Sequence, residues 1–234
     1  MPSQVTNVAS DDALTAIYRL EYEAQEPTIA ARLAEMLEVS APSMSAMLRR
    51  LSRDQLIEIH QRKHIKLAPL GYARAQMMIR RHRLAECLLV DVLGLEWWRA
   101  YEEAHLVEHA LSPVTEGLVR TLLGDPARSP FGYPIPHGDR PSEISMLTLA
   151  DLSQGDQVRI ERVFEEGQEL LQFFDEHNLH PGIAVEVLRR QPVSGTIELT
   201  VGDGRLVLGL TTAELVWVCL PGGRARGRVQ AVPR

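Results

Sequence analysis

The sequence predicts a mainly α-helical protein with a small β domain. We expect a winged helix-turn-helix at the N-terminus, a helical dimerisation region in the middle and a β-barrel at the C-terminal end. Three observations favour this fold class. Two short helical patterns precede a predicted β-hairpin, long amphipathic patterns follow, and short strand patterns separated by glycine turns come last. The length of 234 residues suits one large domain or two to three small ones.

The second and third predicted helices form a helix-turn-helix. Apolar residues recur at helical spacing over residues 12–23 and 29–37. After a short break, Ser40 is a good N-cap and Pro42 fits the first turn of a helix that runs to about Asp54. Two short helices joined by a tight turn place the second one in the major groove of DNA. The candidates for DNA contacts are Ser40 and Pro42 at its start and the outward or flanking residues Ser43, Ser45, Ala46, Arg49 and Arg50.

A predicted β-hairpin follows this helix. Residues 56–60 and 65–67 are apolar and alternating, and the turn between them is polar and basic. A basic hairpin directly after a recognition helix is typical of a wing, which contacts DNA phosphates. Arg62 and Lys63 are therefore candidates for phosphate contacts only.

The distribution of charge supports this interpretation. The chain has 25 Lys and Arg residues against 31 Asp and Glu residues, a net charge of −6 that by itself argues against nucleic-acid binding. Residues 40–83, however, contain ten basic and two acidic residues, so the net charge of this segment is +8. A phosphate-binding surface depends on the local field and not on the net charge.

The middle of the chain predicts three amphipathic helices, over residues 72–93, 96–111 and 113–123. They carry more apolar surface than one small helix-turn-helix can cover. A homodimer would bury that surface, and dimers match the symmetry of double-stranded operators.

The last third of the chain has a different pattern. Residues 128–141 are rich in proline and glycine and predict a loop or linker. The hydrophobic pattern changes again at residue 147. Beyond it we expect a helix near 167–177 and strands at 184–189, 196–201, 205–209 and 215–218. Together these elements indicate a small β-barrel. The predicted domains are therefore 1–74, 75–141 and 142–220, followed by a disordered tail over 221–234.

Several classes of protein are disfavoured. Cys87 and Cys219 are too few for a disulfide scaffold, and no zinc-binding C-x-x-C pair occurs. The N-terminus lacks the pattern of a secretory signal, and no apolar run could cross a bilayer. We therefore expect a cytoplasmic location and no membrane partner.

Imidazoles and carboxylates cluster in the helical region. His105, Glu108 and His109 have the spacing i, i+3 and i+4, and His82 and Glu86 are four residues apart on the preceding helix. These donors, to which Asp12 could add an oxygen, suit Mn²⁺, Fe²⁺, Co²⁺, Ni²⁺ or Zn²⁺. The alternative is that each cluster is an ordinary surface pair.

The chain resembles the diphtheria-toxin-repressor and manganese-transport-regulator family of metal-dependent bacterial repressors. Its helix and loop signatures are similar at residues 81–86, 103–109 and 128–136, and residues 40–45 resemble its recognition-helix entrance. Residues 147–220 look like its third, SH3-like domain, which is shared with the FeoA proteins.

The resemblance implies two metal sites per chain. The primary site would use Asp12, His105, Glu108 and His109, where iron-responsive members have sulfur ligands at the first two positions. The ancillary site would use His82 and Glu86, with Glu166 and Glu169 from the third domain, to within one residue of register. Two family ligands are absent here, because Tyr101 replaces a His and Thr15 replaces a Glu of the manganese regulators. Arg83 and Ser129 match an anion-binding pair, beside which Tyr133 replaces an Asn.

These features predict a homodimeric regulator, most simply a repressor of manganese or iron homeostasis genes. Mn²⁺ is favoured over Fe²⁺ as the corepressor, because Asp and His are harder donors than sulfur. Two alternatives stay open. A winged-helix regulator could sense a non-metal ligand, and a metalloenzyme would also gather His and Glu but would need an open coordination position.

Overall fold

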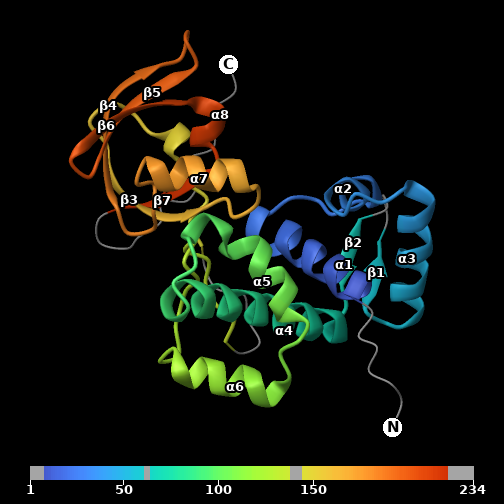
Figure 1. Ribbon diagram of the computed structural model, residues 1–234. Coiled ribbons are helices and arrows are strands. Elements are labelled where there is room, and N and C mark those ends of the chain that lie inside the picture. Colours follow the sequence, from blue (N-terminus) through green and yellow to red (C-terminus); the bar gives the residue numbers. More distant parts are fainter. Residues whose placement is uncertain (1–7, 61–63, 138–143, 221–234) are drawn as a thin grey trace. The chain divides into compact units, whose positions relative to one another are not determined.

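The computed structural model describes residues 8–60, 64–137 and 144–220 of the chain (Figure 1). The expected phosphate contacts Arg62 and Lys63, the end of the 128–141 loop and the tail over 221–234 lie outside these residues. Two compact units are present, one formed by Met1–His82, Leu106–Leu118 and Pro136–Ser142, the other by Arg83–His105, Val119–Ile135 and Glu143–Arg234. Helices α4, α5 and α6 each continue from one unit into the other.

The first unit contains the predicted winged helix-turn-helix. Helix α1 (Val8–Tyr18) continues as a π-helical turn, η1 (Arg19–Ala24), and is followed by α2 (Ala30–Met36) and α3 (Ala41–Arg53). Apolar residues spaced along these helices meet in one core. The largest fully buried side chains of this core are Leu14, Ile17, Leu33, Met44 and Leu51, with Ile79 from the helix that follows the hairpin.

Helix α3 is amphipathic and begins where the sequence predicts. The hydroxyl of Ser40 accepts a hydrogen bond from the Ser43 backbone N–H at 3.3 Å, so Ser40 caps the helix. Met44, Leu48 and Leu51 are buried on one side. The opposite side is therefore available to a partner.

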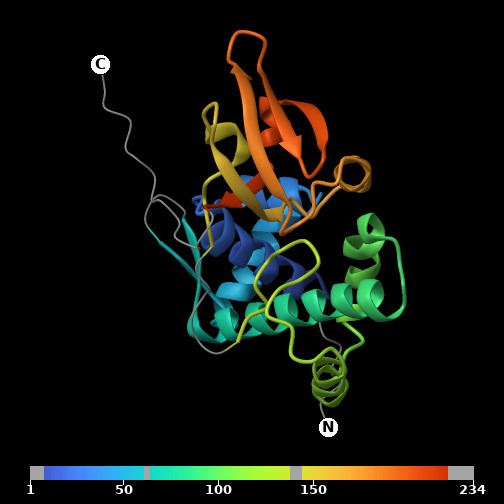
Figure 2. The ribbon, with the colours of Figure 1, turned by 90° about the vertical axis from the view of Figure 1, so that its left-hand side faces the viewer.

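A two-stranded hairpin follows α3, as Figure 1 shows. Strand β1 (Ile57–Ile59) pairs antiparallel with β2 (Ile65–Leu67), with Ile57 opposite Leu67. Helix α4 (Pro69–Cys87) then begins close to β1, where a Cβ atom on Gly71 would lie 1.9 Å from the Leu56 carbonyl oxygen. Only glycine fits this junction. Figure 2 shows that α4 runs on as one long helix.

The helical part of the chain continues with η3 (Leu88–Val92), η4 (Trp97–Arg99), α5 (Ala100–Glu108) and α6 (Pro113–Leu122). The loop after α6 packs on the β domain within the second unit. The Val163 N–H donates to the Phe131 carbonyl at 3.1 Å, and Trp97 Nε1 donates to the Pro130 carbonyl at 3.0 Å. This loop is therefore an ordered part of the second unit.

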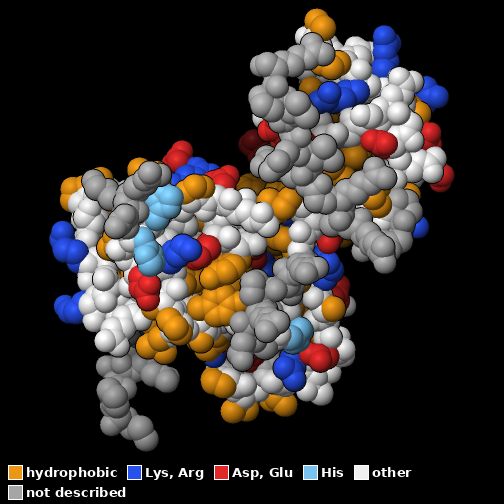
Figure 3. Space-filling view, turned by 180° about the vertical axis from the view of Figure 1, so that it is seen from behind, with side chains coloured by type: hydrophobic (Ala, Val, Ile, Leu, Met, Phe, Trp, Pro, Cys, Tyr) orange, Lys and Arg blue, Asp and Glu red, His pale blue; other side chains and the backbone are white. Residues whose placement is uncertain are grey.

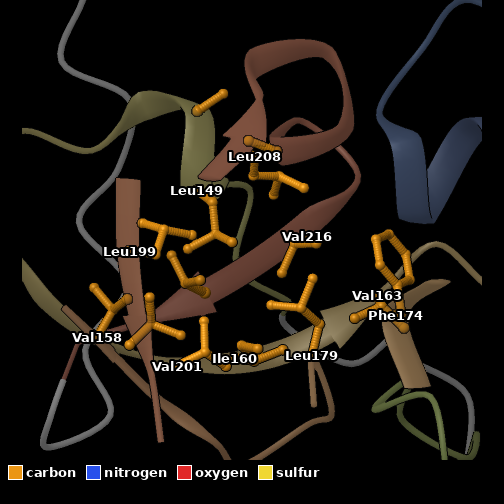
Figure 4. Packing of buried hydrophobic residues seen from close by; sticks show 14 of the residues in the cluster. Leu149, Val158, Ile160, Val163, Phe174, Leu179, Leu199, Val201, Leu208 and Val216 are labelled. Atoms are coloured by element: carbon orange, nitrogen blue, oxygen red, sulfur yellow. The ribbon is translucent and has the colours of Figure 1, made fainter. Parts of the chain in front are cut away.

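The β domain is a five-stranded antiparallel sheet with the order β6-β5-β4-β3-β7. Alternate residues of the strands point inward and form its core, which Figure 4 shows from close by. Helix α7 (Gln168–Glu176) contributes Leu171 and Phe174 to the same core. The strands are β3 (Gln157–Val163), β4 (Ala184–Gln191), β5 (Thr196–Val201), β6 (Gly204–Gly209) and β7 (Val216–Cys219), with η5 (Leu149–Asp151) and α8 (Leu210–Ala213) at the connections.

The predicted fold class is confirmed, with local differences. Helix α1 begins four residues before Asp12, and α5 begins at Ala100 instead of residue 96 because the residues before it form a 3₁₀ turn. Strand β3 and the short helix α8 were not expected as separate elements. The division into three domains stays a prediction.

Candidate metal centre and nucleic-acid interface

Four of the predicted metal ligands lie together. One ligand atom from each of Asp12, His105, Glu108 and His109 can be chosen so that all lie within 4.8 Å of one another. His105 and Glu108 are one turn apart on α5, and His109 follows in the turn after the helix, so helix geometry holds these three on one face. Asp12 comes from α1.

Glu108 is the buried member of this cluster and contacts two imidazoles. Its Oε1 lies 3.2 Å from His109 Nε2, and its Oε2 lies 2.7 Å from His82 Nδ1. His109 Nε2 also lies 3.4 Å from Asp12 Oδ1. His82, on α4, is 2% exposed. The Glu108 carboxylate therefore joins α4 to the cluster, a link that sequence spacing does not reveal.

The donor set suits a hard or borderline divalent cation. Two carboxylates can balance its charge, and two imidazoles can complete its coordination. Across residues 8–60, 64–137 and 144–220 this is the one such group of three or more donors. Burial, the largest effect, raises the pKa of the Cys87 thiol to about 12, so this cysteine is a poor thiolate donor.

The residues expected at the ancillary site are not gathered in the same way. Glu86 is fully buried on α4, whereas Glu166 is half-buried and Glu169 is exposed in the first turn of α7. The buried carboxylate of this segment is instead Glu165, at 2% exposure. Tyr101, at the position of a family ligand, packs against the core of the β domain. A second metal site stays a prediction.

The predicted anion-binding pair has protein partners in the second unit. Arg83 Nη1 donates to the Pro134 carbonyl at 2.7 Å, and its guanidinium lies 4.9 Å from the centre of the Tyr133 ring. Ser129 Oγ accepts from the Phe131 N–H at 3.3 Å. Arg162, which is fully buried, lies 5.6 Å from the same Tyr133 ring. Anion binding by Arg83 and Ser129 stays a prediction.

The predicted DNA-binding residues of α3 form one exposed face, with a single exception. Arg50 is half-buried, and its Nη2 donates to the hydroxyl of Ser10 on α1 at 2.8 Å. Next to Ser10, the buried Asp11 accepts a hydrogen bond from Arg74 Nε at 2.5 Å. The exposed residues are Ser40, Pro42, Ser43, Ser45, Ala46 and Arg49.

A buried ion-pair network connects α4 to α6. Arg80 Nε and Arg81 Nε donate to the two oxygens of Glu116 at 2.5 and 2.9 Å. Desolvation raises the pKa of Glu116, but the hydrogen bonds and charges of Arg81 and Arg80 outweigh it and hold this pKa below the ordinary value of 4.5. Glu116 is therefore ionised at neutral pH and fixes α6 to α4.

The other side of α6 is apolar and exposed. Val114, Leu118 and Leu122 repeat every four residues and are 73%, 67% and 65% exposed. Orange apolar side chains gather at this helix in the lower part of Figure 3. An apolar stripe on a helix is normally covered by a partner.

Comparison with protein families gives three matches along the chain. Residues 8–65 match the N-terminal DNA-binding domain of the iron-dependent repressors, and residues 68–137 match their metal-binding and dimerisation domain. Residues 147–219 match the FeoA domain. No helix in the described part of the chain has the length and apolar character needed to cross a membrane.

Individual proteins are similar over most of the chain. The diphtheria toxin repressor of Corynebacterium efficiens is 33% identical over 76% of this chain and 82% of its own length. The iron-dependent repressor IdeR of Mycobacterium leprae is 44% identical over 53% of this chain, and the chain spans only about half of that protein's length (53%). A solved manganese-dependent transcriptional repressor in complex with manganese has a TM-score of 0.84 at 29% identity, covering 91% of this chain and all of that one.

Proposed function

Because the chain belongs to the iron-dependent repressor family, we propose that it is a DNA-binding transcriptional repressor that a divalent metal ion activates. The observation that carries the proposal is the cluster of Asp12, His105, Glu108 and His109 in a chain that also has a winged helix-turn-helix. Genes of manganese or iron homeostasis are the proposed targets, and the cytoplasm is the proposed location.

The proposed metal ligands are these four side chains. Their oxygen and nitrogen donors fit Mn²⁺ or Fe²⁺, and Mn²⁺ is favoured because the set contains no sulfur. When bound, the cation supplies the positive charge that lets the carboxylates of Asp12 and Glu108 lie close together. His82 holds Glu108 Oε2 and so orients this carboxylate. His82 and Glu86, with Glu166 and Glu169 or the neighbouring Glu165, form the proposed ancillary site.

Three of the proposed ligands, Asp12, Glu108 and His109, come from two different parts of the first unit, which suggests how metal controls DNA binding. Asp12 belongs to α1 of the helix-turn-helix, and Glu108 and His109 lie at the end of α5. Holding these elements together restricts the positions that the DNA-binding helices can take. Metal would thereby favour the DNA-binding arrangement among those already accessible, which is a population shift.

The exposed residues of α3 would contact operator DNA as part of a homodimer. Ser43, Ser45 and Ala46 can reach base edges, whereas Arg49 is suited to phosphates or guanine. Arg62 and Lys63 would contact phosphates. The exposed apolar stripe on α6 would bury itself against a second copy of the chain.

The experiment uses a duplex selected from random-sequence DNA by the Mn²⁺-loaded wild-type protein. We expect binding, measured by fluorescence anisotropy, to be lost on chelation and restored by Mn²⁺ or, under anaerobic conditions, by Fe²⁺. The Glu108→Ala, His109→Ala double variant should fall towards non-specific affinity, a loss of roughly a thousandfold or more. Glu102→Ala, at an exposed position of α5, is the matched control.

Three results would contradict parts of this proposal. Operator binding that ignores chelation would favour a regulator of another ligand. A normal metal response in the double variant would place the activating metal elsewhere. Turnover of a substrate by the metal-loaded protein would favour a metalloenzyme. Parallel titrations with Mn²⁺, Fe²⁺ and Zn²⁺ would identify the metal.

A further inference from the structure

We propose that Ser10 is a positioning residue that ties the recognition helix α3 to the metal-binding helix α1 through Arg50. In this proposal Arg50 acts inside the protein and not on DNA. The inference rests on the proposed function, because it explains how metal at Asp12 could reach the DNA-contacting face of α3.

The contact between the two helices is direct and shielded from solvent. Arg50 Nη2 donates to Ser10 Oγ at 2.8 Å, although the two residues are 40 positions apart in the sequence. Ser10 is only 4% exposed, so its hydroxyl cannot itself reach a DNA phosphate. A hydrogen bond from a charged donor is stronger than a neutral one, and partial burial protects it from competition by water.

Three consecutive residues of α1 contact three different elements. Successive residues of an α-helix point about 100° apart, so Ser10, Asp11 and Asp12 face different neighbours. Ser10 binds Arg50 of α3, Asp11 binds Arg74 of α4, and Asp12 lies beside His109 at the end of α5. This first part of α1 is therefore the junction at which the metal ligand and the recognition helix are held by the same rigid turn.

The place of Arg50 on α3 suits a positioning role. It lies in the last turn of the helix, so a contact there fixes the end of α3 opposite to the Ser40 cap. The groove-facing residues Ser43, Ser45 and Ala46 lie earlier on the helix. Because α3 behaves as a short rod, a change in the position of its last turn alters the direction in which these residues point.

The test compares wild type with Ser10→Ala on the selected duplex at saturating Mn²⁺. We expect the dissociation constant for DNA to rise about tenfold, the effect of losing one charge-assisted hydrogen bond. Mn²⁺ affinity, measured separately by electron paramagnetic resonance, should remain within about twofold of wild type. Ser52→Ala, at an exposed position of α3, is the matched control and should keep wild-type DNA affinity.

A double-mutant cycle separates a positioning role of Arg50 from a phosphate contact. If Arg50 acts through Ser10, then Arg50→Ala and the double variant should lose the same DNA affinity, and both should keep the wild-type salt dependence. A direct phosphate contact would instead lower the slope of log affinity against log salt by about one in Arg50→Ala. That result, or additive losses in the cycle, would overturn the inference.

Failure of the inference is distinguishable from failure of the proposed function. A metal-responsive wild type with Ser10→Ala at wild-type DNA affinity overturns the inference alone. The inference is also overturned if Ser10→Ala weakens Mn²⁺ and DNA binding in proportion, because Ser10 would then support the metal site. A wild type that binds the duplex equally well in chelator overturns the proposed function and the inference with it.

Discussion

At the scale of single residues, we expect metal binding by the cluster of Asp12, His105, Glu108 and His109 to depend on the orientation of the Glu108 carboxylate. Glu108 is buried, and both of its oxygens are close to imidazole nitrogens, His82 Nδ1 at 2.7 Å and His109 Nε2 at 3.2 Å. A carboxylate held in this way needs little reorganisation to accept a cation. Side chains that orient a metal ligand typically change metal affinity by about 10- to 100-fold when they are removed.

We therefore expect His82→Ala to weaken Mn²⁺ binding at the first site by about tenfold or more, because Glu108 loses the partner that orients it. Isothermal titration calorimetry would give both the affinity and the number of ions bound. If His82 orients Glu108, its removal lowers the affinity of the first site. If His82 is instead a ligand of a second site, its removal lowers the number of bound ions by one per chain. Unchanged affinity and stoichiometry would exclude both roles. His177→Ala in the β domain is the control.

The candidate ligands could be predicted from sequence only where they are neighbours on a helix. The spacing of His105, Glu108 and His109 is a local signal, because one turn of helix brings the three together. The contacts of Ser10 and Asp11 are not local, since their partners Arg50 and Arg74 are 40 and 63 residues away. No periodicity reveals such pairs. Their signal is the burial of polar residues, which only the folded chain shows.

At the scale of elements, the attachment of α6 to α4 should depend on pH. The pKa of Glu116 is lower in the folded chain than its ordinary value of 4.5. The stability that this pair provides is therefore complete above about pH 4.5 and is lost as the pH falls through the lower pKa of the folded state. Urea unfolding of the metal-free chain from pH 7 to pH 3 would measure this loss.

The ion pairs of Glu116 on α6 also predict the effect of a substitution at neutral pH. Glu116→Gln should lower the free energy of unfolding by about 2 kcal/mol, because Arg80 and Arg81 lose their charged acceptor. The variant should also lose the part of the acid dependence that Glu116 causes. Glu26→Gln, at an exposed position of the first unit, should leave both properties unchanged. Equal unfolding curves for Glu116→Gln and wild type would show that the ion pairs contribute nothing.

The loop after α6 provides an element-scale prediction within the second unit. Gly132 has φ +92°, and a Cβ atom there would lie 2.0 Å from the Glu161 carbonyl oxygen of β3. Gly132→Ala should therefore displace the loop and destabilise the protein by about 2 kcal/mol or more. Near-ultraviolet circular dichroism should report the change, because Trp97 packs on Phe131 in this loop. Gly209→Ala, where a Cβ meets nothing within 4 Å, is the control.

Sequence patterns predicted most elements but not β3. Its residues include Arg159, Glu161 and Arg162, a polar content that hides a central strand between β4 and β7. Arg162 is nevertheless fully buried, with its guanidinium 4.4 Å from the centre of the Trp217 ring and a hydrogen bond to the Ser145 carbonyl. These tertiary contacts stabilise the buried arginine, and the apolar pattern of the sequence does not predict them.

At the scale of the whole molecule, basic and acidic residues are concentrated in different parts of the sequence. The net charge of −6 combines the +8 of residues 40–83 with an excess of carboxylates elsewhere. Some of these carboxylates have identified roles inside the protein. Glu116 pairs with both Arg80 and Arg81, and Asp11 pairs with Arg74, so two carboxylates offset part of the charge of three arginines of the basic segment. We therefore expect the field available to DNA to depend chiefly on the exposed arginines of α3 and on the predicted wing residues.

Assembly gives the last prediction, because an operator with two half-sites requires two copies of α3. Val114, Leu118 and Leu122 form an exposed apolar stripe on α6, and burying it in a homodimer would remove it from water. Leu118→Glu places a charge in the middle of this stripe. We expect it to shift the protein from dimer to monomer in sedimentation velocity and to lower DNA affinity at least tenfold.

A control variant separates assembly from folding in this experiment. Val193→Glu adds the same charge at a fully exposed position in the turn between β4 and β5, so it should leave sedimentation and DNA binding unchanged. Leu118→Glu should still bind Mn²⁺, because the candidate ligands Asp12, His105, Glu108 and His109 all lie in one chain. A dimeric Leu118→Glu variant would move the subunit interface away from α6. A monomeric variant with full DNA affinity would show that one winged helix is enough for operator binding.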